Sequence, residues 1–111
     1  MKMRWEFIYY SSRIKKDILD LPKELLADFF ALRDTMMEKG PNIGMPYTRA
    51  MGEGLFEMRL DAKNNIGRVF YCTVTKHEIM VLHCFVKKTR KTPDRELQLA
   101  RKRLKEVKQN D

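Results

Sequence analysis

Apolar and polar residues alternate over residues 3–10, MRWEFIYY, at the start of the chain. Trp5, Phe7 and Tyr9 fall on one face of this segment, and the residues between them fall on the other. An alternation with a period of two residues, in a composition rich in aromatic side chains, is typical of a strand. We therefore expect the chain to open with a strand.

Two helices are expected next, because apolar residues then recur every three or four positions. The serine pair at 11–12 supplies an N-cap for a short helix. A proline begins a longer helix over about 22–39, along which leucine, phenylalanine and methionine form a wide apolar stripe. Residues 40–54 hold four glycines and two prolines in fifteen positions, so they form a loop with room for a short strand near 47–51.

Three further strands are expected in the second half of the chain. Residues 55–61, LFEMRLD, alternate apolar and charged side chains, and residues 66–75, IGRVFYCTVT, are β-branched and aromatic. Residues 79–86, IMVLHCFV, are apolar on both faces, which favours a central strand. Turn residues separate these runs, so we expect an antiparallel meander.

A last helix is expected at the C-terminus. Thr92 supplies its N-cap and Pro93 its first helical position. An apolar stripe follows on an otherwise basic helix: Leu97, Ala100, Leu104 and Val107.

The order strand, helix, helix, three strands, helix predicts an α+β fold. Two N-terminal helices would pack on a small, mostly antiparallel sheet, and a basic helix would follow it. A chain of 111 residues with 43% hydrophobic content is large enough for one core. We therefore expect a single domain over residues 1–111.

Positive charge is concentrated at the C-terminal end of the chain. Lys+Arg 23 against Asp+Glu 15 give a formal net charge of +8. Residues 87–108 hold ten basic and three acidic residues, whereas residues 1–86 hold thirteen and eleven. Such one-sided charge favours an anionic partner, above all nucleic acid, over a merely solvated face. We expect phosphate contacts from Lys88, Arg90, Lys91, Arg95, Arg101 and Arg103.

Cysteine content and hydropathy bear on the compartment. Cys72 and Cys84 lie within apolar stretches, where a free cysteine behaves as a small hydrophobe, and they make no disulfide framework. No apolar run approaches the roughly 18 residues that span a bilayer, and the N-terminus has no signal-peptide pattern. We therefore expect a cytoplasmic protein that does not associate with membranes.

Three segments together resemble a known family. GLFEMRL, then GRVFY, then VLHCFVKKTRKTP leading into a basic helix are similar in order and spacing to the phage-derived, Gp49-like HigB branch of the RelE and ParE toxin superfamily. The resemblance covers nearly the whole chain, and the block FVKKTRKTP is its most specific part. It implies a RelE-like fold and a toxin of a type II toxin–antitoxin system.

The resemblance also implies an activity and partners. Toxins of this kind enter the ribosomal A site and cut mRNA, which inhibits translation. A cognate antitoxin, often a helix-turn-helix protein of the HigA kind, neutralises the toxin in a hetero-oligomer and represses their operon. We accordingly expect the ribosome, mRNA and such an antitoxin as partners.

Cleavage of RNA through its own 2′-hydroxyl needs no metal or cofactor. It needs a base for that proton, cations for the charge on the phosphorane and an acid for the departing 5′-oxygen. If the three strands are neighbours, their polar side chains converge on one patch. The resemblance implies that Arg59 and Arg68 bind the scissile phosphate, assisted by Lys87 or the lysine beside it. It implies that Glu57 or His83 acts as base or acid.

The chain departs from the better-known RelE pattern at positions that transfer protons. That pattern has two lysines where this chain has Glu57 and Arg59, and a late tyrosine, whereas this chain has no tyrosine after Tyr71. An arginine is a poor proton shuttle because its pKa stays above about 12. A lysine with a lowered pKa, or His83 with an ordinary pKa of about 6.5, can serve instead, and the assignment stays open.

Other interpretations of these residues stay open as well. His83 can be a satisfied buried histidine, and Glu57 and Arg59 can form a structural charge network with Arg68. The alternative functions are a ParE-like toxin that binds DNA gyrase without catalytic residues, and a non-catalytic RNA-binding or ribosome-binding module. The affinity of such a module would fall in step with its charge and steeply with salt.

Overall fold

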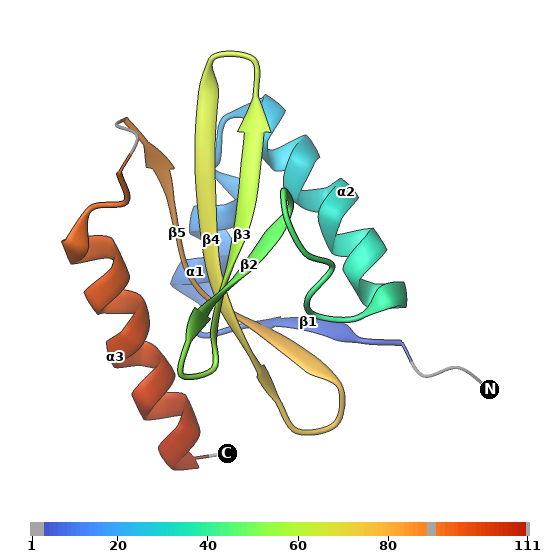
Figure 1. Ribbon diagram of the computed structural model, residues 1–111, viewed down its shortest axis with the longest axis vertical. Coiled ribbons are helices and arrows are strands. Elements are labelled where there is room, and N and C mark those ends of the chain that lie inside the picture. The colour runs from blue at the N-terminus through green and yellow to red at the C-terminus, as the bar shows by residue number, and fades with distance from the viewer. Residues whose placement is uncertain (1–3, 89–90, 111) are drawn as a thin grey trace.

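The computed structural model describes residues 4–88 and 91–110 of the chain (Figure 1). Its elements follow the order that the sequence predicts, with one strand more. They are β1 (Glu6–Tyr9), α1 (Ser12–Leu19), α2 (Lys23–Lys39), β2 (Thr48–Gly52), β3 (Leu55–Ala62), β4 (Asn65–Val74), β5 (Glu78–Lys87) and α3 (Asp94–Asn110).

The strands form one sheet in the order β1, β5, β4, β3, β2. From β2 to β5 each strand is antiparallel to its neighbours, as the predicted meander requires, whereas β1 is parallel to β5. β1 and β2 are the two edge strands, and α1 and α2 carry the chain from one edge to the other (Figure 1). The predicted α+β fold with two N-terminal helices and a C-terminal helix is therefore confirmed.

The helices cover both faces of the sheet (Figure 1). Ile14 of α1 with Leu25 and Phe29 of α2 belongs to a core on one face, and Ala100 and Leu104 of α3 belong to a core on the other. Residues on both faces of β4 and β5 are therefore buried, which explains why the sequence of β5 is apolar throughout. β5 lies inside the sheet as predicted, although β4 is the middle strand.

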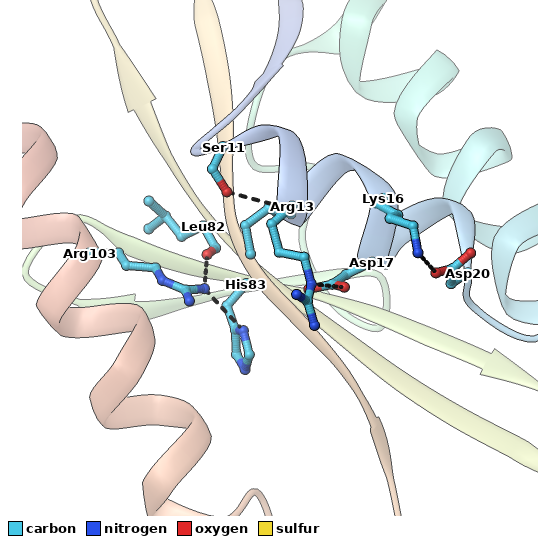
Figure 2. A network of polar contacts seen from close by, with 9 residues as sticks. Ser11, Arg13, Lys16, Asp17, Asp20, Leu82, His83 and Arg103 are labelled. Carbon is cyan, nitrogen blue, oxygen red and sulfur yellow. Dashed lines mark hydrogen bonds and ion pairs between the residues drawn. The ribbon is translucent and has the colours of Figure 1, made fainter.

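Local signals at the helix ends act largely as the sequence predicts. The hydroxyl of Ser11 accepts a hydrogen bond from the backbone nitrogen of Ile14 at 3.2 Å, which caps α1 (Figure 2). The carbonyl of Pro93 accepts the bond from the backbone nitrogen of Leu97 at 3.3 Å. α3 therefore begins at Asp94, so Pro93, and not Thr92 as predicted, is the residue directly before the helix.

β2 lies in the glycine-rich loop, where the sequence indicated only room for a strand. Gly52 and Gly54 make the turn into β3 with φ of 94° and 87°, a backbone conformation that other residues rarely adopt. At the other end of β2, the buried hydroxyl of Thr48 accepts a hydrogen bond from the backbone of Gly44 at 2.8 Å. The strand is thus fixed at both ends.

A bulge in the pairing of β4 with β5 turns two consecutive residues toward α3. Phe70 lies opposite His83 and Tyr71 opposite Val81, so Leu82 is the extra residue. Leu82 is buried in the core under α3, His83 also contacts α3, and Val81 belongs to the core on the other face. The bulge therefore decides what His83 can reach.

The two cysteines form no disulfide, because Cys72 and Cys84 are both free and buried. In residues 4–88 and 91–110, no helix is long and apolar enough to span a membrane. In the same residues, no three His, Cys, Asp or Glu side chains form a group that could hold a metal ion.

Candidate functional site

A fully buried carboxylate lies among three arginines on the sheet face that also carries the α3 core. Glu57 in β3 is 0% exposed. Its Oε1 lies 3.3 Å from Nη2 of Arg49 in β2 and 3.3 Å from Nη1 of Arg59 in β3, and its Oε2 lies 3.7 Å from Nε of Arg68 in β4. We call these four residues the arginine cluster.

Strand geometry explains how the arginine cluster forms. Glu57 and Arg59 are two residues apart, so their side chains project from the same face of β3. The register sets Arg49 opposite Glu57 and Arg68 opposite Arg59. Two like charges directly opposite each other are destabilising, and the carboxylate between them offsets that repulsion.

Arg68 is held close to the backbone but is not fully satisfied. It is 5% exposed, and its Nη1 donates to the carbonyl of Gly67 at 2.8 Å. Its Nε and the Oε2 of Glu57 are buried and have no hydrogen-bond partner among the described residues, because the 3.7 Å between them is too long for one. Burial, followed by the charge of Arg59, lowers the pKa of Arg68.

The arginine cluster carries an excess of positive charge. Three guanidinium groups surround one carboxylate, and two of them reach the surface: the side chain of Arg49 is 46% exposed and that of Arg59 is 28% exposed. A guanidinium group presents its donors in a fixed fork that matches a phosphate. The cluster is therefore suited to bind an anion at the surface, while its buried residues Glu57 and Arg68 stay fixed.

Lys87 stands next to this charge at the end of β5. It lies opposite Ile66 in the register, two residues along from the position of Arg68 in β4. Burial lowers the pKa of Lys87, and the positive charge of Arg68 lowers it further, whereas Glu57 acts in the opposite direction. Lys87 therefore releases its proton more readily than an ordinary lysine.

His83 lies on the same sheet face as the arginine cluster, with Phe70 of β4 between it and Glu57 in the register, and it contacts α3 (Figure 2). Its Nε2 lies 2.7 Å from Oε1 of Glu96, and Nη1 of Arg103 lies 3.3 Å from its Nδ1 and donates to the carbonyl of Leu82 at 2.8 Å. An imidazole that accepts from Arg103 and donates to Glu96 is satisfied in its neutral form. The geometry matches the alternative of a satisfied buried histidine. The apolar sequence of β5 did not predict the bulge that brings His83 to this position.

The predicted phosphate-contacting residues divide into two groups. Lys88, Lys91 and Arg95 are exposed between β5 and the start of α3. Arg101 instead donates to the carbonyls of Met51 and Gly52, and Arg103 donates to the carbonyl of Leu82 in β5. Both residues therefore hold α3 against the sheet. The remaining residue of the prediction, Arg90, lies outside the described residues.

Arg49 is the residue of the arginine cluster that the sequence did not single out. It lies in the glycine-rich segment, where a strand was foreseen only as a short stretch. Its role depends on the register of β2 against β3, which places it opposite Glu57. A polar side chain in a short strand next to a charged strand was the available signal, and it does not specify a register.

Two comparisons with known proteins bear on this site. Residues 16–105 match the model of the family described as phage derived protein Gp49-like (DUF891). The match includes all four residues of the arginine cluster as well as Lys87. No curated protein matches the chain.

Proposed function

From the premise that the chain belongs to the Gp49-like family of phage-derived proteins, which is related to toxin–antitoxin systems, we propose that it is a toxin that cuts mRNA on the ribosome. In this proposal it is a metal-independent endoribonuclease of a type II system. It acts in the cytoplasm and inhibits translation until a cognate antitoxin neutralises it.

The arginine cluster is the observation that carries the proposal. Its net positive charge, its surface-reaching guanidinium groups and its buried carboxylate make a preorganised site for a phosphodiester. Donors that are fixed before the reaction stabilise charge as it develops without reorganisation in the transition state. Arg49, Arg59 and Arg68 would therefore bind the scissile phosphate more strongly as the phosphorane than as the diester.

The reaction that fits this site is attack by the neighbouring 2′-oxygen of the RNA. The 2′-hydroxyl loses its proton, its oxygen bonds to phosphorus, and the bond from phosphorus to the 5′-oxygen breaks. The departing 5′-oxygen takes up a proton, which leaves a 2′,3′-cyclic phosphate and a 5′-hydroxyl end. The proton of the 2′-hydroxyl passes to water, the arginine cluster stabilises the phosphorane, and a neighbouring cation supplies the proton to the departing oxygen.

Lys87 and Glu57 take different roles in this proposal. Lys87 has a lowered pKa beside the arginine cluster, so it donates the proton to the departing oxygen. Glu57 is fully buried and already paired with Arg49 and Arg59, so it orients the guanidinium groups. His83 is engaged with α3 and contributes to stability.

The partners follow from the family and from the exposed cations. Its relation to toxin–antitoxin systems implies an antitoxin, and we propose a helix-turn-helix protein of the HigA kind that forms a hetero-oligomer with this chain. Lys88, Lys91 and Arg95 are exposed beside α3 and would contact ribosomal RNA. Removing their charge would weaken ribosome binding without stopping the chemical step.

The test is induced expression in a bacterial host, followed by mapping of new mRNA 5′ ends. The wild type should produce 5′-hydroxyl ends in phase with codons of translated frames, and Arg59→Ala should remove them. Arg13→Ala is the matched control, because that arginine lies on the exposed face of α1 in a pair with Asp17 (Figure 2). Growth arrest with intact mRNA and broken DNA would overturn the proposal and point to gyrase.

A further inference from the structure

A pocket of about 340 Å³ lies at the edge of β3, beside the arginine cluster. It is lined by α2, by the loop before β2 and by β3, and its polar or aromatic lining residues are Asp28, Tyr47, Arg59 and Asp61. β2 pairs with β3 only as far as Met58, and beyond that residue the loop before β2 and α2 line the edge of β3. Arg59 belongs to both the pocket and the arginine cluster, so the two sites meet at the edge of β3, with the pocket on the α2 side and the cluster on the face that carries the α3 core.

Backbone hydrogen bonds hold the walls of this pocket in place. The nitrogen of Arg59 donates to the carbonyl of Tyr47 at 2.8 Å, and the nitrogen of Asp61 donates to Oδ2 of Asp28 at 3.0 Å. The nitrogen of Tyr47 in turn donates to the carbonyl of Gly44 at 3.0 Å. These bonds tie the loop, β3 and α2 together, so the pocket is formed before any ligand arrives.

Tyr47 is an exposed aromatic residue in the lining of the pocket. It is 52% exposed although it is a large side chain, and the nearby Met45 is 60% exposed. Exposed aromatic rings next to a cationic groove are the usual platforms on which the bases of single-stranded RNA stack. Tyr47 and Arg59 line the same pocket, and the side chain of Arg59 pairs with Glu57 in the arginine cluster.

The charge inside the pocket is opposite to that of the arginine cluster. Asp28 and Asp61 line it, and a carboxylate accepts hydrogen bonds but offers none when ionised. These groups repel a phosphate and attract the amino groups of bases. The adjoining sites therefore separate the two parts of a nucleotide, with the phosphate at the cluster and the base in the pocket.

We propose that this pocket binds the nucleobase next to the scissile phosphate, an inference that rests on the proposed nuclease function. Tyr47 stacks on the base, and Asp28 and Asp61 accept hydrogen bonds from its exocyclic amino group. Adenine, cytosine and guanine each carry an exocyclic amino group, whereas uracil carries none and has only carbonyl oxygens as exocyclic groups. The pocket thus selects against uracil at one fixed position beside the cut.

The inference is tested with purified ribosomes programmed with messages that differ by one nucleotide beside the cut. At one fixed position beside the cut, the message with uracil should be cut most slowly. The wild-type protein should cut the messages with adenine, cytosine or guanine at that position at least about fivefold faster. Asp28→Asn should bring that ratio close to one, because an amide both donates and accepts. This substitution keeps the acceptor for the backbone of Asp61.

Tyr47 has its own variants in the same assay. Tyr47→Ala should lower cutting of every message about fivefold or more, because each base loses its stacking partner. Met45→Ala is the matched control, since Met45 is an exposed loop side chain that does not line the pocket.

The outcomes separate this inference from the proposed function. Equal cutting of all messages by the wild type, or Tyr47→Ala cutting as fast as Met45→Ala, would overturn the base pocket and leave the nuclease intact. A wild-type protein that cuts no message on the ribosome would overturn both.

Discussion

Nε of Arg68 lies 3.7 Å from Oε2 of Glu57, and both atoms are buried without a hydrogen-bond partner among the described residues. The two groups attract each other as charges but do not form a hydrogen bond. A buried donor without a partner is costly, and an anion that supplies an acceptor relieves that cost. This relationship makes the arginine cluster a structural element that is also suited to bind an anion.

Glu57→Gln tests whether the buried carboxylate stabilises the arginine cluster. The variant keeps the shape of the side chain but leaves three arginines without their counter-charge, so we expect the free energy of unfolding to fall by roughly 3 kcal/mol. Urea denaturation followed by tryptophan fluorescence or circular dichroism measures the change. Glu38→Gln, at an exposed position of α2, is the control and should have no effect. An unchanged midpoint for Glu57→Gln would show that the arginines need no buried carboxylate.

Lys87→Arg separates the charge of this residue from its ability to transfer a proton. An arginine preserves the positive charge but holds its proton, so we expect cutting on the ribosome to fall about 100-fold or more while ribosome affinity stays unchanged. Single-turnover cleavage and ribosome cosedimentation measure the two quantities. The control is Lys88→Arg, at the exposed neighbouring position. Full activity in Lys87→Arg would exclude Lys87 as the proton donor.

The pH dependence of cleavage has a defined sign. Lys87 donates a proton only while it is charged, and its pKa is lowered from the ordinary 10.5. The cutting rate should therefore decline as the pH rises through this lowered pKa, below the pH at which an ordinary lysine would lose its charge. Single-turnover rates measured from neutral pH up to the ordinary lysine pKa of 10.5 would show the decline. A rate that keeps rising over this range would contradict the role assigned to Lys87.

His83→Gln distinguishes stability from catalysis at β5. The side chain of His83 is 12% exposed and bridges Glu96 and Arg103, so we expect its loss to lower the free energy of unfolding by about 1 kcal/mol. The cutting rate of the folded variant should stay within about threefold of the wild type, because both ring nitrogens of His83 already contact Glu96 and Arg103 of α3. A loss of about 100-fold with unchanged stability would instead restore His83 as base or acid.

Much of the fold follows from local patterns in the sequence. A period of two residues predicts β3 and places Glu57 and Arg59 on the same face, because side chains alternate along any strand. The stripe of leucine and alanine in α3 predicts the face that packs on the sheet. The parallel pairing of β1 with β5 could not be read in this way, because it joins segments far apart in the chain.

In the candidate site, too, some features follow from the local sequence and others only from the packing of the whole sheet. The sequence by itself determined which residues are charged, that Glu57, Arg59 and Arg68 lie in adjoining strands, and that Lys87 ends an apolar strand. Only the tertiary structure decided that Arg49 faces Glu57 and that a bulge turns His83 toward Glu96. Strand register and bulges depend on the turns and the packing of the whole sheet, whereas a local period specifies only the face on which a side chain lies.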